Sequence, residues 1–174
     1  MLDIEKIYDR YFDEIFNYIL KRVLNVALAE DLAGVVFMKV VDKIDTYDPD
    51  KASVRTWIYS ITNNELIDYY RRKRIKKPYD DLKPFLKDED VLKEIQKKQD
   101  KLQKNKLYKD ILAILDKKLS MEERDIIIMH YIEGMKYKEI SEIKDLNENT
   151  LRSKAHRALK KVKNLIDLEK RGLK

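Results

Sequence analysis

Residues 137–162 read YKEISEIKDLNENTLRSKAHRALKKV, the pattern of two helices joined by a tight turn. The first helix is expected over 137–143, and the turn over 145–147. Asn147 is a favourable N-cap for the second helix, which is expected to run on to about residue 168. Short helices joined by a three- or four-residue turn, with the second more basic, predict a helix-turn-helix.

The second of these helices has one apolar and one polar face. Leu151, Ala155, Ala158, Leu159 and Val162 recur at helical spacing and would pack against Ile140 and Ile143, while Leu146 fills the turn. Short polar and arginine side chains at a helix N-terminus suit base edges in a major groove, and cations further along suit phosphates. The opposite face carries Asn149, Arg152, Ser153, His156, Arg157 and Lys160.

The composition of the whole chain excludes several other classes of protein. Only three of its 174 residues are glycine, too few for a dinucleotide fingerprint or a P-loop. There is no cysteine and there are two histidines, so no disulfide, thiolate nucleophile or zinc cage is expected. Hydrophobic content of 44% with few glycines and prolines favours an all-α fold.

Positive charge is concentrated in two segments. Residues 47–77 carry eight basic and four acidic residues, and residues 147–166 carry six basic residues and one acidic residue. The net charge of the whole chain is only +6. The segments that precede them, 1–46 and 120–146, each carry a net charge of −3. This distribution indicates two separate basic modules and an acidic partner such as nucleic acid.

The N-terminal half is predicted to form three helices, over 4–24, 28–44 and 54–74. Asp48-Pro49 stops the second helix, and Ser53 is a plausible N-cap for the third. The third helix ends in RRKRIKK and carries aromatic rings, which together suit unpaired bases and their backbone. Trp57 taken alone is more readily explained as a core residue.

Two helical domains joined by a flexible linker are therefore expected: 1–77, a linker over 78–106, and 107–174. Prolines and a nearly uninterrupted polar stretch mark the linker, whether it is a solvated helix or a disordered segment. In the second domain, Ser120 and Glu123 predict a capping box at the start of a helix, and Gly134 is expected to end that helix.

The motifs of both domains resemble the extracytoplasmic-function group of bacterial RNA polymerase sigma factors. Region 2 of that family matches Ala29–Phe37, Asp48-Pro49, Val54–Asn64 and Asp68–Arg72. Region 4 matches Leu119-Ser120, Arg124, Tyr131–Gly134, Tyr137–Ser141 and Thr150–Ala158. The resemblance covers nearly the whole chain.

This resemblance implies a sigma factor that binds core RNA polymerase and directs initiation from promoters with −10 and −35 elements. It implies contacts with the clamp helices of the β′ subunit, the β flap and promoter DNA, with an anti-sigma or other recruiting protein as a further candidate partner. No cofactor, metal or catalytic residue is expected.

The resemblance also implies which residues make these contacts. The implied −35 residues are Asn149, Thr150, Arg152, Ser153, Lys154, His156, Arg157 and Lys160. The implied −10 residues are Asp50, Lys51, Ser53, Trp57, Asn64, Tyr69, Arg71, Arg72 and Arg74. The implied polymerase-binding residues are Asp31, Leu32, Gly34, Val35 and Phe37.

The chain departs from the family in its second predicted helix. Gly34, Val35 and Val36 stand where the family carries polar side chains, and a glycine within a helix costs about 1 kcal/mol relative to alanine. Either the polymerase contact differs here, or the apolar patch meets another protein.

Two alternative functions follow from the residues alone. A stand-alone helix-turn-helix regulator would bind duplex DNA by itself and have no use for residues 47–77. A magnesium-dependent nuclease would use carboxylates such as Asp31, Asp42, Asp45 and Asp48, although solvated helix positions explain these acids better.

His130 is expected to be structural and His156 to make a polar or phosphate contact. The N-terminal stretch has no signal-peptide pattern and no apolar run approaches a membrane span, so a cytoplasmic protein is expected.

Overall fold

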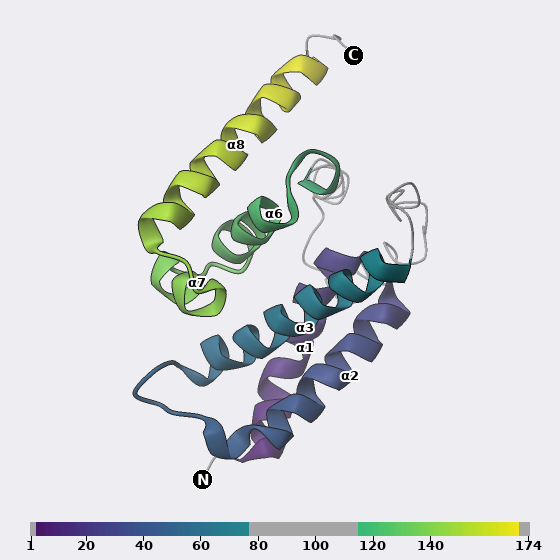
Figure 1. Cartoon of the computed structure of the whole chain (residues 1–174), viewed down its shortest axis with the longest axis vertical. Coiled ribbons are helices and arrows are strands. Elements are labelled where there is room, and N and C mark those ends of the chain that lie inside the picture. Colours follow the sequence, from purple (N-terminus) through teal and green to yellow (C-terminus); the bar gives the residue numbers. More distant parts are fainter. Residues whose placement is uncertain (1–2, 77–114, 171–174) are drawn as a thin grey trace. The chain divides into compact units, whose positions relative to one another are not determined.

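The computed structural model describes residues 3–76 and 115–170, which form helices joined by short connections, with no strand in these ranges. The chain divides into two compact units, Met1–Lys101 and Leu102–Lys174 (Figure 1). The predicted all-α fold is confirmed. The predicted linker over 78–106 lies outside the described residues. None of the described helices is long and apolar enough to cross a membrane.

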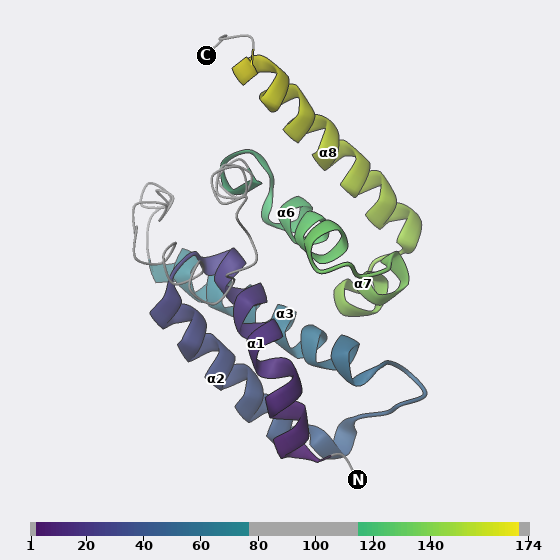
Figure 2. The same ribbon diagram turned by 180° about the vertical axis from the view of Figure 1, so that it is seen from behind.

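Three helices form the first unit: α1 (Ile4–Val23), α2 (Val26–Asp42) and α3 (Val54–Lys76). The α1 helix packs against both α2 and α3, as the view from behind in Figure 2 shows. A single 3-10 turn, η1 (Ile44–Thr46), follows α2, so that helix ends two residues before the predicted Ile44.

The core of the first unit lies where the three helices meet. Ile15, Tyr18 and Ile19 of α1 are fully buried together with Val36 of α2 and Ile58 of α3. The rings of Tyr18 and Tyr59 meet edge to face, with 4.9 Å between their centroids. The apolar side of α1 is therefore core along most of its length, but Ile4 and Tyr8 at its N-terminal end are exposed.

Local chemistry fixes the ends of these helices. Leu24 adopts a left-handed conformation (φ 51°) at the end of α1, and the Asn25 side chain accepts a hydrogen bond from the Leu28 amide at 2.8 Å to begin α2. The predicted N-cap Ser53 is confirmed, because its hydroxyl accepts a hydrogen bond from the Thr56 amide at 3.1 Å.

The second unit contains α6 (Met121–Ile127), η3 (Ile128–Ile132), α7 (Tyr137–Lys144) and α8 (Glu148–Lys170). The predicted capping box is present, since Ser120 and Glu123 each bind the other's backbone amide. The α8 helix packs against both α6 and α7.

The segment after α6 is a π-helical turn, where the sequence predicts the continuation of an ordinary helix. The Glu133 amide reaches back to the carbonyl of Ile128 at 2.9 Å, a span of five residues. Two residues of this turn, Ile128 and Met129, are buried, as are Ile126 and Ile127 just before it at the end of α6. Gly134 follows with φ +69° and ends the helix, as predicted.

The helix-turn-helix is formed by α7, a turn and α8. Asp145 adopts a left-handed conformation (φ 52°) after α7, and the side chain of Asn147 accepts a hydrogen bond from the Asn149 amide at 2.8 Å. Ile140 and Ile143 are buried as predicted, as are three residues of α8: Leu151, Ala155 and Ala158. Leu159, predicted as part of this stripe, is exposed instead.

Candidate nucleic-acid interface

The N-terminal half of α8 presents a continuous polar face opposite its buried stripe. Seven of the eight predicted −35 residues are exposed on it: Asn149, Thr150, Arg152, Ser153, His156, Arg157 and Lys160. Six of them recur at steps of three and four residues, so they share one side of the helix. The side of α8 that could enter a groove is thus free of core contacts.

Arg152 lies on this face and has two neighbours that contact its guanidinium. Glu148, one turn earlier, pairs with it at 3.2 Å. The guanidinium also lies over the Tyr137 ring, 5.5 Å from the centroid, within the range of a cation–π contact. The Arg152 side chain nevertheless remains 61% exposed, so it is accessible to a ligand.

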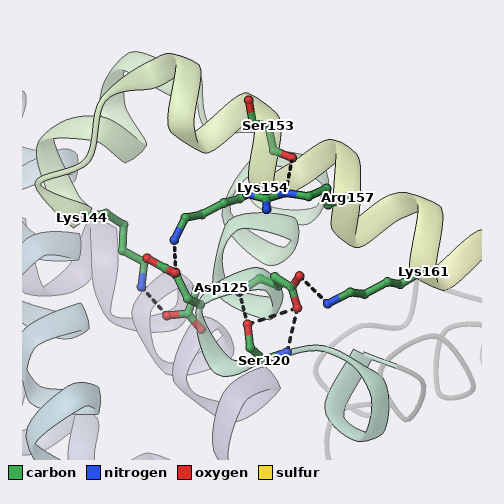
Figure 3. A network of polar contacts seen from close by, with 9 residues as sticks. Ser120, Asp125, Lys144, Ser153, Lys154, Arg157 and Lys161 are labelled. Carbon is green, nitrogen blue, oxygen red and sulfur yellow. Dashed lines mark hydrogen bonds and ion pairs between the residues drawn. The ribbon is translucent and has the colours of Figure 1, made fainter.

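Lys154 is the one predicted −35 residue that turns away from the polar face. Its ammonium pairs with Glu122 of α6, and further along α8 Lys161 pairs with Glu123 of α6 at 2.6 Å. Figure 3 shows both lysines reaching from α8 toward α6, with Lys144 of α7 bound to Asp125 nearby. The acids of α6 therefore tie α7 and α8 to it.

The pKa of Glu123 reflects these ion pairs. Burial raises this pKa, but hydrogen bonds from Lys161 and Ser120 outweigh that effect and lower it below its usual value. Glu123 therefore stays ionised, and its bond to Lys161 persists, across the neutral pH range.

In the first unit, three predicted −10 residues form a row along α3. Trp57, Asn64 and Arg71 are spaced seven residues apart, so they lie on the same side of the helix over about 21 Å. Asn64 and Arg71 are exposed and Trp57 is half-buried. The row places a ring, an amide and a cation along one helix face.

The loop before α3 is held in shape by its own side chains. Asp48 accepts a hydrogen bond from the Asp50 amide at 3.0 Å and pairs with Lys51 at 3.1 Å. The Tyr47 hydroxyl donates to the carbonyl of Ala52 at 3.0 Å, and its ring packs on Trp57 with 5.3 Å between centroids. Tyr47 thus connects the loop to α3, a role for which the sequence carries no local signal.

The basic end of α3 contains paired cations. Arg71 pairs with Asp68 at 3.0 Å, and Arg72 pairs with Glu65 at 2.8 Å. Tyr69 is half-buried against Tyr70, and burial raises its pKa. The side chain of Arg74, also predicted to contact the −10 element, lies outside the described residues.

Glu65 joins this basic end to α2. Its carboxylate is buried and also binds Lys39 of α2. Burial raises its pKa, but the hydrogen bonds from Lys39 and Arg72 outweigh burial and hold it below the usual value. An ionised Glu65 therefore couples the helix that carries the predicted −10 residues to the helix predicted to bind polymerase.

The predicted polymerase-binding residues of α2 divide between surface and core. Asp31, Gly34 and Val35 are exposed, whereas Leu32 and Phe37 are buried. Met38, 69% exposed, and Val41 extend the exposed side toward the end of the helix. Val36 is buried as well, so the apolar surface consists of Val35, Met38 and Val41 rather than Gly34–Val36.

The two histidines have different environments. The Nδ1 atom of His130 lies 2.7 Å from the carbonyl oxygen of Met135, and its ring stacks on Tyr137 at 4.1 Å, which supports the predicted structural role. His156 is exposed on α8. Within the described residues, no three His, Cys, Asp or Glu side chains form a group that could hold a metal ion.

Comparisons with known proteins agree with this division into two units. The family model of sigma-70 region 2 matches residues 7–75, and that of sigma-70 region 4 matches residues 115–162. The ECF RNA polymerase sigma factor SigM of Bacillus subtilis is 27% identical over 165 residues, covering 94% of this chain and 95% of its own. RNA polymerase sigma factor YlaC of the same organism is 26% identical and covers 89% of this chain and 87% of its own.

A solved structure shows the same fold. The sigma factor RpoE of Bartonella quintana, in complex with the anti-sigma factor NepR, superimposes with a TM-score of 0.70 at 17% identity, covering 94% of this chain and 96% of that chain. The two family matches together span both units, and the relatives that match along nearly the whole chain include an ECF sigma factor. This chain therefore belongs to the extracytoplasmic-function group of RNA polymerase sigma factors, which direct transcription initiation from promoters.

Proposed function

We propose that this sigma factor reads the −35 element with α8 and captures the opened −10 element with α3 and the loop before it. The exposed polar face of α8 carries the proposal, because it combines a capped helix N-terminus with arginine and short polar side chains. Arg152 and its exposed neighbours would meet base edges, and Arg157 and Lys160 would meet phosphates.

The proposed −10 contacts use the row along α3. The half-buried ring of Trp57 and the amide of Asn64 would meet unpaired bases, with Asp50, Lys51 and Ser53 in the adjacent loop. Tyr69 would add a second ring, and Arg71, Arg72 and Arg74 would hold the backbone. In this assignment residues 1–77 form the −10 domain, 107–174 form the −35 domain, and 78–106 link them.

Core RNA polymerase would dock on the exposed side of α2. Asp31, Gly34 and Val35 face solvent there together with Met38 and Val41, and exposed apolar side chains gathered on one side are typical of protein-binding surfaces. The β′ clamp helices are the proposed occupant, and the β flap would meet the second unit. An anti-sigma protein could compete for the same side of α2, since a structural relative is known in complex with one.

Reconstituted transcription tests this function. The full chain would be added to core RNA polymerase from its own organism, with a library of genomic promoter fragments as template. Initiation that depends on the added chain, from fragments that share two spaced elements, is the expected result. Tight duplex binding by the chain alone, with no gain in transcription, would instead support a stand-alone helix-turn-helix regulator.

A substitution on α2 tests polymerase docking separately. A Cβ placed on Gly34 would meet no atom within 4 Å, so a long charged side chain fits there without disturbing the core. Gly34→Arg should weaken binding to core polymerase, while the unfolding midpoint should not fall below that of the parent because arginine is a better helix former than glycine. Unchanged polymerase affinity would remove this side of α2 from the interface.

A further inference from the structure

On the polar face of α8, Arg152 contacts two side chains, one of which belongs to another helix. Its guanidinium lies between an acidic neighbour on its own helix, Glu148, and an aromatic residue on the preceding helix, Tyr137. An unrestrained arginine side chain loses about 2 kcal/mol of rotamer entropy when it is fixed. An arginine that is already held loses less on binding, which favours affinity and a defined geometry.

Tyr137 is itself firmly placed. It is the first residue of α7, its ring stacks on His130 at 4.1 Å with 27° between the planes, and His130 is in turn held at the carbonyl of Met135. Burial, with a hydrogen bond to Tyr131, raises the pKa of Tyr137 to about 12, so the phenol remains neutral at physiological pH. A chain of contacts therefore runs from the π-helical turn to the guanidinium on α8.

We propose that Tyr137 is a positioning residue for −35 recognition: its ring holds the Arg152 guanidinium in the orientation that bidentate contact with a base requires. The inference rests on the proposed role of Arg152 as a base reader. Bidentate contact demands a defined plane and direction of the fork, and a ring beside the guanidinium removes part of the space in which it could otherwise turn. Tyr137 touches no base in this arrangement and acts only through Arg152.

A double-mutant cycle tests the proposal. The full chain, bound to core polymerase from its own organism, would be titrated with promoter duplexes that carry each of the four base pairs at each −35 position in turn. The measured quantity is the ratio of affinities for the preferred and substituted base pairs. The variants are Tyr137→Leu, Tyr137→Phe, Arg152→Ala and the combination of Tyr137→Leu with Arg152→Ala.

Arg152→Ala should reduce the ratio at one position by about 5- to 150-fold. Tyr137→Leu should reduce the ratio at that same position by about two- to five-fold, the effect of losing an exposed cation–π contact. Tyr137→Phe keeps the ring and should stay within two-fold of the parent. In the Arg152→Ala background, Tyr137→Leu should cause no further loss at that position.

Two outcomes would contradict the inference, and they can be told apart. If Tyr137→Leu lowers the ratios equally with and without Arg152, or lowers them at every position together with the unfolding midpoint, Tyr137 has only a structural role and the inference is wrong. If Arg152→Ala changes no ratio, the proposed reading role of Arg152 fails first, and the inference fails with it.

Discussion

Lys154 of α8 forms an ion pair with Glu122 of α6, 32 residues earlier in the chain. The family motif assigns Lys154 to the DNA-binding segment, yet its ammonium is directed to the protein's own acid. Glu122 thereby withholds one positive charge from the polar face of α8. Lys154 lies one helical turn before Arg157 of that face, so we expect a change at Glu122 to alter DNA binding.

Replacement of Glu122 by glutamine should strengthen binding to promoter duplex. The substitution removes the charge that holds Lys154 and frees the ammonium to meet a phosphate. One additional phosphate contact should steepen the dependence of log affinity on log salt by about 0.9. Affinity measured over a range of salt concentrations checks this, with the full chain bound to core polymerase.

Glu142→Gln is the matched control, because it makes the same change in net charge at an exposed position of α7. The control should leave the salt slope nearly unchanged. An equal steepening in both variants would show that net charge, rather than release of Lys154, is responsible.

Two glycine substitutions should change stability in opposite directions. Gly34 lies within α2, and a Cβ there meets open space, so Gly34→Ala should stabilise the protein by about 1 kcal/mol through helix propensity. Gly134 has φ +69°, where a Cβ costs about 1–2 kcal/mol, so Gly134→Ala should destabilise it. Urea unfolding followed by circular dichroism measures both, and a loss of stability in Gly34→Ala would contradict the helix assigned there.

Glu65 should make stability depend on pH in the acid range. Its folded pKa lies below the usual 4.5, so its contribution is fully present above about pH 4.5 and is lost as pH falls through the lowered folded value. Glu65→Gln should cost about 1.5–3 kcal/mol at neutral pH, as expected for hydrogen bonds to a charged group.

Unfolding free energies of the parent and Glu65→Gln, measured from pH 7 to pH 3, check the sign. The difference between the two proteins should be constant near neutrality and shrink toward acid. A difference that grows as pH falls would mean that Glu65 is not the ionised partner of Lys39 and Arg72.

Arg71→Ala should weaken binding of the opened −10 strand without changing its sequence preference. Loss of one phosphate contact to a single strand should flatten the salt slope by about 0.7. Holoenzyme binding to a template opened at the −10 element provides the measurement. Lys6 is the control, since it forms an exposed pair of the same spacing with Asp3, also at 3.0 Å, but on α1. A similar flattening from Lys6→Ala would exclude a specific contact by Arg71.

Much of the fold could be predicted from the sequence because the signals that fix helix ends are local. Ser53, Ser120 and Asn147 act as N-caps through hydrogen bonds to amides two or three residues away. Gly134 ends a helix through its own backbone conformation. Such features depend on near neighbours in the chain, so sequence spacing alone identifies them.

The π-helical turn could not be predicted in this way. Its buried residues Ile128 and Met129 continue an apolar run from the end of α6 that has no helical period, and only the packing around this run selects a wider turn over an ordinary one. The surface of α2 is a similar case, because Val35 and Val36 are identical in type and adjacent, yet one is exposed and the other is core. Periodicity placed a helix there, and the packing of α1 and α3 decided which side was buried.

The sequence by itself determined the two helical units, the helix-turn-helix and the set of side chains from which a promoter-binding surface can be built. The tertiary structure alone decided the partners of those side chains: Lys154 with Glu122, Arg152 with Tyr137, and Glu65 with Lys39. The physical reason is range. Caps and turns are satisfied within a few residues, whereas an ion pair or a cation–π contact forms between whichever groups the packing of helices brings within reach.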